Sequence, residues 1–226
     1  MIRSVPETGS TNADLLADPS AGEGDWLVAR RQSAGRGRAG RAWRDGAGNF
    51  MGSTVVALRP DDAPAQTLAL VTGLAAHSAL GDIPGLILKW PNDLLVAGAK
   101  LGGVLLERQD ERVVVGIGIN LAQAPAVADR ATVALADLGM EVDVDSFAEA
   151  LAASFAAVLA RWHGGEWPAL REAWLARAHP LGTPLVAAGS IGAFAGLGDD
   201  GALHLRLADG TVRPIHAGDV EMVGKA

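Results

Sequence analysis

Six arginines crowd into one short segment in which glycines alternate with charged residues. They are Arg30, Arg31, Arg36, Arg38, Arg41 and Arg44. Glycine lets a backbone approach a ligand closely, and the planar guanidinium group offers paired donors that suit phosphate. The segment from Gln32 to Trp43 therefore predicts a loop that binds a polyphosphate. A solvated flexible loop or an arginine-glycine RNA-binding tract has a similar composition, but flanking strands and the adjoining tryptophan favour a ligand-binding loop.

A second polar segment, Lys89-Trp90-Pro91-Asn92-Asp93, lies between two apolar runs. Proline and asparagine favour a turn, and a turn would hold the Asp93 carboxylate at a fixed position. Carboxylates held in this way can act on a bound substrate. An ordinary hairpin corner with its own Asx turn is the alternative reading of the same residues.

Glycines also open space beside two apolar runs further along the chain. Lys100 precedes Gly102 and Gly103, and Gly116 and Gly118 interrupt the run that ends at Asn120. Because glycine weakens a strand, its repeated use suggests that a ligand needs the room. A solvated surface lysine and a barrel corner or bulge are the competing explanations.

Composition excludes several other kinds of chemistry. The chain has 226 residues, 49% of them apolar, no cysteine and a formal net charge of −7. Disulfides, thiolate metal sites and cysteine nucleophiles are therefore excluded, and the five histidines lack ligand spacing, so we expect no protein-built metal site. The pattern G-x-x-x-x-G-K-[ST] is absent, and the G-x-G-x-x-G at residues 35–40 lacks the acidic partner of a dinucleotide fold. No apolar segment resembles a secretory signal or a membrane span, which favours the cytoplasm.

The elements that must position these residues can be read from periodicity and turn signals. A short helix is expected after the N-cap at Ser10-Thr11-Asn12. Longer helices are expected from Asp62 or Pro64 to about Leu80, from a capping box at residues 146–149 to about Trp162, and over residues 167–178. Strands are expected at residues 26–29, 51–58, 86–89, 102–107 and 112–119, the last two forming a hairpin.

The pattern changes after about Pro180 to short alternating runs separated by glycine and aspartate. The runs are residues 185–186, 191–194, 202–207, 212–215 and 220–223. They predict a small β-barrel, so we expect one domain over residues 1–179 and another over residues 180–226. The fold class is α+β, with a mixed β-sheet and flanking helices followed by a compact all-β module.

Taken together and in order, the polar segments closely resemble the biotin protein ligases, in the short form without an N-terminal DNA-binding domain. That family pairs S-T-N with G-R-G-R-x-G-R-x-W, K-W-P-N-D, K-x-x-G-[IV]-L-x-E and G-[IA]-G-I-N. The counterparts here are Ser10 to Asn12, Gly35 to Trp43, Lys89 to Asp93, Lys100 to Glu107 and Gly116 to Asn120. The resemblance implies a catalytic domain like that of class II aminoacyl-tRNA synthetases and an SH3-like C-terminal barrel.

The resemblance also implies a reaction in two steps. Biotin and ATP give biotinyl-5′-AMP and pyrophosphate with Mg²⁺, and a lysine of a biotin carboxyl carrier protein, such as that of acetyl-CoA carboxylase, then displaces AMP. The residues implied to be catalytic are Lys100, Arg36, Arg38 and Asp93. Those implied to bind biotin are Ser10, Thr11, Asn12, Gln32, Gly35, Arg36, Arg38, Lys100, Gly103, Leu105, Gly116 and Gly118. Those implied to bind the nucleotide are Arg36, Arg38, Trp43, Asn92, Lys100 and Asn120.

Two alternatives remain open at this point. A lipoate-protein ligase shares the fold and the adenylation chemistry, but its usual R-R-x-[ST]-G-G-G loop is not continued after Ser33. A nucleic-acid-binding module could use the arginine loop, but the net charge of −7 opposes binding to a phosphate backbone. Only nine residues precede Ser10, so we expect no DNA binding. We also expect no membrane association, and the chain could form a homodimer. Residues 121–138 lack the aromatic residue that some members of the family place over adenine.

Overall fold

The computed structural model describes residues 1–44, 46–127 and 130–223, and the last three residues of the expected C-terminal domain lie outside that description. Its strands are β1 (Ile2–Val5), β2 (Trp26–Ala29), β3 (Phe50–Ala57), β4 (Leu86–Lys89), β5 (Asp93–Val96), β6 (Ala99–Gln109), β7 (Arg112–Ile119), β8 (Pro184–Ala187), β9 (Ser190–Leu197), β10 (Leu203–Arg206), β11 (Val212–Ile215) and β12 (Val220–Met222). Its α-helices are α1 (Thr11–Ala17), α2 (Leu68–Leu80), α3 (Val144–His163) and α4 (Trp167–Leu175).

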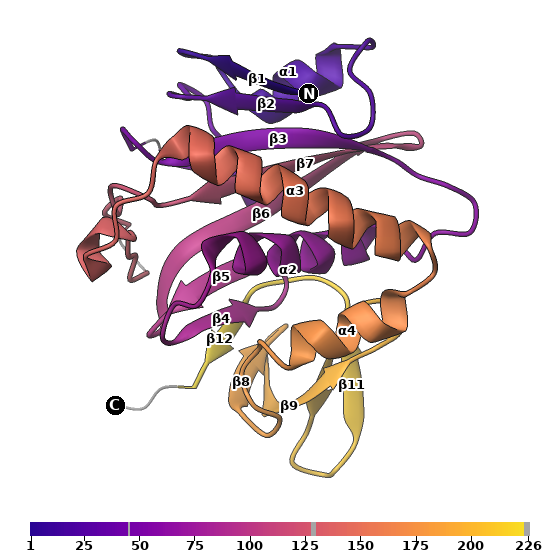
Figure 1. Ribbon diagram of the computed structural model, residues 1–226. Coiled ribbons are helices and arrows are strands. Elements are labelled where there is room, and N and C mark those ends of the chain that lie inside the picture. Colours follow the sequence, from indigo (N-terminus) through magenta and orange to yellow (C-terminus); the bar gives the residue numbers. More distant parts are fainter. Residues whose placement is uncertain (45, 128–129, 224–226) are drawn as a thin grey trace.

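A seven-stranded sheet forms the larger part of the molecule (Figure 1). Its order is β1-β2-β3-β7-β6-β5-β4, and only the β1–β2 pair is parallel. The hairpin of β6 and β7 turns at Asp110, whose φ of 53° is the left-handed conformation that such tight turns use. The sheet is therefore mixed, and the expected fold class is confirmed.

Alternation along the strands gives the sheet two different faces. On one face, Val28, Val56 and Val115 join the main apolar core, which α2 and α3 cover (Figure 1). On the opposite face, Leu27 and Val55 pack in a small cluster beneath α1, which also includes Leu15 and Val114. The glycines at 103, 116 and 118 share this second face, because Gly116 and Gly118 are two and four residues from Val114 and Gly103 pairs with Gly118. The helices thus leave part of the second face free to form a site.

The helices begin where side chains can satisfy their first N–H groups. Ser10 caps α1 as expected, since its hydroxyl accepts a hydrogen bond from the Ala13 N–H. The expected capping box at Ser146 is wrong: Asp143 is the N-cap of α3 and accepts from the Ser146 N–H. Aspartate and serine are both good N-caps. Asp143 lies three residues before Ser146, so α3 begins three residues earlier than expected.

Two other expected helix bounds also differ from the structure. Pro64 is extended, with ψ of 131°, and the chain passes through a 3₁₀ turn at Ala65–Thr67 before α2 begins at Leu68. α4 ends at Leu175 rather than at residue 178 because the chain then pairs with the outer edge of β4, where the Leu88 N–H donates to the Arg177 carbonyl. This pairing covers one edge of the large sheet.

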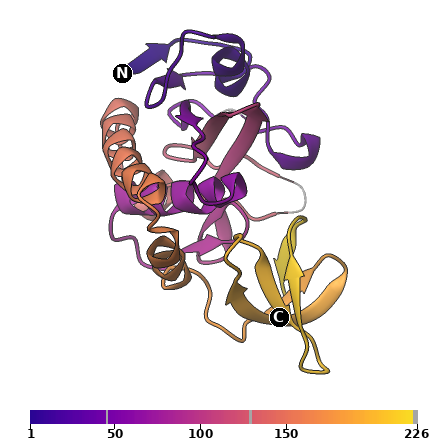
Figure 2. The ribbon, with the colours of Figure 1, turned by 90° about the vertical axis from the view of Figure 1, so that its right-hand side faces the viewer.

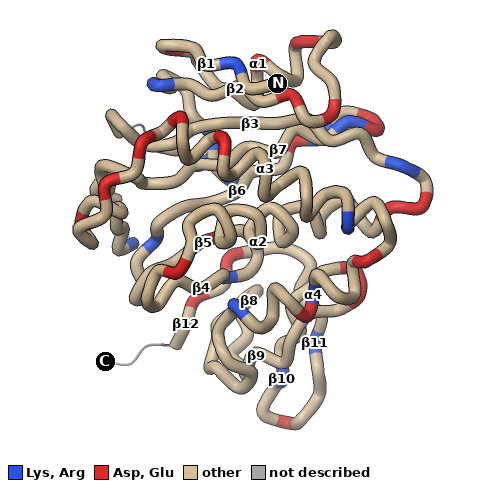
Figure 3. Tube along the Cα trace, in the orientation of Figure 1, with Lys and Arg blue, Asp and Glu red and all other residues tan. Residues whose placement is uncertain are grey.

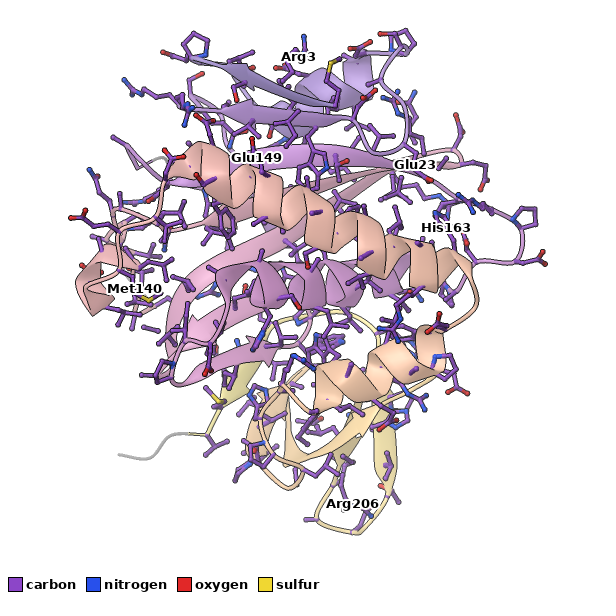
Figure 4. All side chains as sticks on the ribbon, viewed as in Figure 1. Arg3, Glu23, Met140, Glu149, His163 and Arg206 are labelled. Carbon is purple, nitrogen blue, oxygen red and sulfur yellow. The ribbon has the colours of Figure 1, made fainter. Side chains whose placement is uncertain are left out.

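The C-terminal end of α3 is held in place by His163, whose side chain is buried. His163 contacts Asp62 through Nδ1 at 2.7 Å and Glu23 through Nε2 at 3.2 Å (Figure 4). Its role is therefore structural, as the scattered histidines suggested. Among the described residues, every helix is too short or too polar to span a bilayer.

The C-terminal strands form a separate five-stranded antiparallel sheet of order β11-β10-β9-β8-β12, which is an SH3-like module. Figure 2 shows this sheet at one end of the large one. The turn between β9 and β10 joins them, because the Gly201 carbonyl accepts from Trp90 Nε1 at 2.9 Å and the Asp199 carbonyl accepts from Trp167 Nε1 at 2.6 Å. The second sheet thus touches the chain directly before the Asn92-Asp93 turn.

Candidate active site

A cavity of about 770 Å³ opens on the second face of the large sheet. Strand register gives it a floor of two rows. The first row runs across four strands as Lys89, Asp93, Gly103 and Gly118, and the second consists of Leu105, Gly116 and Ser53. Most of this floor lacks large side chains, which leaves a trough in the middle of the sheet. A cavity of this size is typical of small-molecule sites.

One end of the trough is lined by neutral polar groups that hold one another in place. Gln32 Oε1 accepts from the Thr11 N–H at 2.8 Å, and Thr11 Oγ1 lies 2.6 Å from Ser53 Oγ. The Ser53 hydroxyl donates to Asn12 Oδ1 at 2.6 Å. Thr11, Asn12 and Ser53 are all buried, so this network is shielded from water. It can recognise the hydrogen-bonding groups of a neutral heterocycle.

Glu107 links this network to the arginine loop. It accepts from Asn12 Nδ2 at 2.8 Å and lies 3.2 Å from the Arg36 guanidinium. Asn12 itself fills the space over Gly116, where a Cβ would come within 2.3 Å of its Oδ1. Any side chain at position 116 would therefore displace Asn12.

Positive charge gathers at the other end of the trough. The Lys100 ammonium group forms an ion pair with Asp93, which is only 8% exposed. Lys89 Nζ lies 3.9 Å from the same carboxylate and an Arg130 nitrogen lies 3.5 Å from it. Burial lowers the pKa of Lys100 below its ordinary value, and Asp93 opposes that effect. Burial likewise lowers the pKa of Lys89.

The arginine loop crosses the mouth of the cavity and reaches the second sheet. Arg38 donates to Asn92 Oδ1 at 3.2 Å, and Arg41 makes a bidentate ion pair with Asp219 at 3.0 and 2.8 Å. Burial lowers the pKa of Arg38, whereas the hydrogen bond to Asp219 raises that of Arg41. In Figure 2 the loop, drawn in purple, lies on the same side of the molecule as β12. Both sheets therefore contribute to the mouth of the cavity.

Two residues that line this region each have a buried polar atom without a hydrogen-bond partner within the described part of the chain. They are Trp43 Nε1 and Asn120 Oδ1. The Asn120 amide nitrogen donates to the Lys100 and Val133 carbonyls, so its orientation is fixed and its oxygen is left available. Trp43 lies over Gly118 and 5.8 Å from Lys100 Nζ. Orphaned buried donors and acceptors in a cavity indicate places where a ligand completes the hydrogen bonding.

The structure brings nearly all of the expected site residues together around this cavity. Its lining includes Ser10, Thr11, Asn12, Gln32, Arg36, Arg38, Trp43, Asn92, Asp93, Lys100, Gly103, Leu105, Gly116, Gly118 and Asn120. Gly35 is the exception. It lies at the start of the loop and outside the cavity lining, where a Cβ would come within 2.8 Å of the Trp43 carbonyl oxygen, so its role is to let the loop fold on itself.

Sequence reasoning missed several lining residues, and three of them have polar side chains that make contacts in the site. Ser53 comes from an ordinary strand, Arg130 from a segment without a motif, and Asp219 from the second sheet. The alternation of β3 could have placed Ser53 on the same face as Val55. No sequence signal brings Arg130 or Asp219 to the site, because each arrives through tertiary contacts.

Comparisons with known proteins match both parts of the chain. The pattern of the biotin/lipoate A/B protein ligase family matches residues 2–123, and that of the biotin protein ligase C-terminal domain matches residues 186–223. A biotin–[acetyl-CoA-carboxylase] ligase of Paracoccus denitrificans is 42% identical over 89% of this chain and 92% of its own length. A protein with the same name from Mycobacterium tuberculosis is 36% identical over 96% of this chain and 86% of its own.

Solved structures of biotin protein ligases are also similar to this chain. The biotin protein ligase of Aquifex aeolicus in complex with biotin and ATP superposes with a TM-score of 0.86 at 26% identity, over 98% of both chains. Its R40G mutant in complex with biotin superposes with a TM-score of 0.84, also at 26% identity.

Proposed function

This chain belongs to the biotin/lipoate A/B protein ligase family, and from that premise we propose how its cavity carries out the reaction of a biotin protein ligase. Biotin and ATP give biotinyl-5′-AMP and pyrophosphate, and the biotinyl group passes to a lysine of a carrier protein. The observation that carries this assignment is the position of Lys100, where the glycine-lined trough meets the row of cations. A carboxylate in the trough and a phosphate on the cations would meet at that ammonium group.

The bicyclic ring of biotin fits the neutral end of the trough. Thr11, Gln32 and Ser53 offer donors and acceptors there, with Ser10 and Asn12 beside them. Gly116 and Gly118 let Asn12 and Trp43 pack close to the sheet, and the ring and its tail would lie in the cavity that these residues line. Asn120, whose side chain donates to the Lys100 carbonyl, is four positions after Gly116, about 13 Å along a strand. The biotin carboxylate would therefore point toward Lys100.

Lys100 acts by lowering the cost of bringing two anions together. In the first step a biotin carboxylate oxygen attacks the α-phosphorus of ATP, and a point charge between them offsets their repulsion and the charge that develops. Arg36 and Arg38 can hold the adenylate from above because the loop that carries them crosses the cavity mouth. Trp43 Nε1 and Asn120 Oδ1 then have a nucleotide to bond, with Asn120 toward the adenine.

Magnesium enters this scheme with ATP. Among the described residues no group of three or more acidic or histidine side chains could hold a metal ion, and Asp93 and Asp219 are both engaged by cations. Mg²⁺ commonly binds through substrate phosphates and waters with few protein ligands, which fits this lining. It would supply charge neutralisation for the leaving pyrophosphate.

We propose that the acceptor is the biotin carrier of a carboxylase, because both relatives named above are biotin–[acetyl-CoA-carboxylase] ligases. Asn92 and Asp93 line the cavity, and the incoming lysine would approach them there. The reaction is expected in the cytoplasm, where ATP is available, and without DNA binding. Residues 1–179 would form the catalytic domain and residues 180–226 the SH3-like one. The exposed edge strand β1 offers a surface on which two copies could pair as a homodimer.

Calorimetry with biotin, lipoate and ATP tests the substrate assignment. Biotin should bind in the absence of nucleotide, and lipoate should bind at least about 100-fold more weakly because it lacks partners for the buried polar network. Tight binding of lipoate without binding of biotin would overturn the assignment.

A further inference from the structure

The Asp93 carboxylate is surrounded by more positive charge than it can neutralise. Lys89, Lys100 and Arg130 all lie within ion-pair distance of it, so one negative charge faces three positive ones. Two of these cations belong to the recognised K-W-P-N-D and lysine-glycine segments, whereas Arg130 belongs to none. The excess charge faces the cavity and calls for an anionic ligand.

Arg130 is held beside Lys100 by backbone hydrogen bonds. The Lys100 N–H donates to the Ala131 carbonyl at 2.9 Å, and the Val133 N–H donates to the Lys100 carbonyl at 3.0 Å. The Arg130 side chain lines the cavity and is 34% exposed, so it can exchange its contact with Asp93 for a ligand. Its charge is therefore both positioned and accessible.

Strand register shows in which direction the cation row extends. The row Lys89–Asp93–Gly103–Gly118 crosses the sheet at right angles to the strands, at about 4.8 Å per strand. The glycine half of the row is the floor of the trough. The charged half leads from Gly103 through Asp93 to Lys89, and Arg130 reaches the same Asp93 carboxylate from outside the sheet. An anion whose first charged group meets Lys100 would extend along that half.

We propose that Arg130 binds the β- and γ-phosphates of ATP and the pyrophosphate that leaves. This inference rests on the proposed function. In the adenylation step a carboxylate oxygen forms a bond to the α-phosphorus. The bond from that phosphorus to the oxygen bridging to the β-phosphate breaks, and pyrophosphate departs with the bonding electron pair. Arg130 stabilises the negative charge that builds on the departing group, and its fork of donors suits a phosphate.

The proposal separates the two half-reactions. Biotinyl-5′-AMP has no β- or γ-phosphate, so Arg130 should matter for adenylation and not for transfer from preformed adenylate. If Arg130 served only to hold Asp93 and Lys100 in place, both half-reactions would suffer together.

The test compares the wild-type protein with Arg130→Ala, Arg130→Lys and Arg108→Ala. Arg108 is an exposed arginine outside the cavity that pairs with Glu111, and its replacement removes the same charge from the chain. Measurements are the KM for ATP and kcat of biotin-dependent pyrophosphate release, inhibition by added pyrophosphate, and single-turnover transfer from supplied biotinyl-5′-AMP. Pyrophosphate binding is also measured directly by calorimetry.

Arg130→Ala should weaken ATP and pyrophosphate binding by roughly 10- to 100-fold, since a hydrogen bond to a charged group is removed. Transfer from biotinyl-5′-AMP should stay within about twofold of wild type, Arg130→Lys should recover part of the loss, and Arg108→Ala should change nothing. Unchanged pyrophosphate binding, or equal losses in both half-reactions, would overturn the role of Arg130. If the wild-type protein released no pyrophosphate with biotin, the proposed function would be refuted instead. The role of Arg130 would then still be tested by comparing pyrophosphate binding to wild type and Arg130→Ala by calorimetry.

Discussion

Lys100 carries a largely buried ammonium group, 15% exposed, whose position is fixed by its neighbours. Asp93 forms an ion pair with the Lys100 ammonium group, and the centroid of the Trp43 ring lies 5.8 Å from Lys100 Nζ. The Asn120 side chain donates a hydrogen bond to the Lys100 backbone carbonyl. Lysine suits this location because it is a compact point charge that can approach two anions at once. At the scale of single residues, the account therefore depends on this charge and its protonation state.

Lys100→Ala should reduce the rate of biotin-dependent pyrophosphate release by roughly 100- to 1000-fold, the usual cost of removing one group that stabilises charge in a transition state. The fold should survive, because Lys89 and Arg130 still accompany Asp93. Stopped or steady-state release assays and a thermal melt give the two readings. Release within tenfold of wild type from a folded variant would remove Lys100 from the mechanism.

The protonation of Lys100 should appear in the pH dependence of adenylation. Burial lowers its pKa, so as pH rises the charged form is lost earlier than for an ordinary lysine with a pKa of about 10.4. Activity needs the charged form and should therefore fall through an alkaline limb below that value. Lys100→Arg should move the limb upward, since a guanidinium stays protonated. A limb at the same pH in both proteins would assign it to another group.

At the scale of elements, the site is shaped by the register of neighbouring strands and by the glycines in them. Two neighbouring strands, β6 and β7, align Gly103 with Gly118 and Leu105 with Gly116, so glycines on different strands open one continuous trough. The loop from Gly35 to Trp43 then covers it. At this scale the glycines are as important as the charged residues.

Gly116→Ala should disturb the biotin end of the trough. Its new methyl group would lie 2.3 Å from Asn12 Oδ1, so Asn12 must move and its contacts with Ser53 and Glu107 must change. The KM for biotin should rise at least tenfold while that for ATP stays within about threefold. Gly22→Ala is the control, because a Cβ there meets only Asp25 Oδ2 at 3.9 Å. Equal effects of the two substitutions would contradict the trough.

Sequence patterns predicted the elements better than the contacts between them. The bounds of β2, β4, β7 and β11 match the expected runs because alternation and turn residues are local signals. β1 was missed, since its four residues are mostly exposed and lack an apolar pattern. β5 corresponds to the apolar run that follows the polar turn, for which no strand bounds were predicted. The motif residues make up most of the cavity lining, whereas Arg130 and Asp219 belong to no motif and reach the cavity only through tertiary packing.

The two sheets act as one unit at the scale of the whole molecule. The second sheet contacts Trp90 next to the Asn92-Asp93 turn and pairs through Asp219 with Arg41 in the arginine loop. In the view of Figure 3, acidic and basic residues are interspersed along the trace. The positive charge that matters is concentrated in the cavity.

Asp219→Asn should loosen the arginine loop. Its hydrogen bond with Arg41 lowers the pKa of Asp219, so the ion pair is present above the ordinary value of about 3.9 and is lost as pH falls through the lowered one. At pH 7 the variant should show faster hydrogen exchange in residues 35–43, with a stability loss of about 1 kcal/mol or less because the pair is exposed. The difference from wild type should vanish in acid. Asp209→Asn, in a turn of the same sheet, should leave loop exchange unchanged; equal acceleration by both would refute the contact.

A crystal structure with bound biotinyl-5′-AMP tests the central claim most directly. The account predicts that the bicyclic ring lies beside Thr11 and Gln32, and that Lys100 Nζ and the Arg36 or Arg38 guanidinium lie within about 3.2 Å of the same acyl-phosphate group. A ligand bound elsewhere, or an ammonium that stays on Asp93 out of reach of the phosphate, would contradict it.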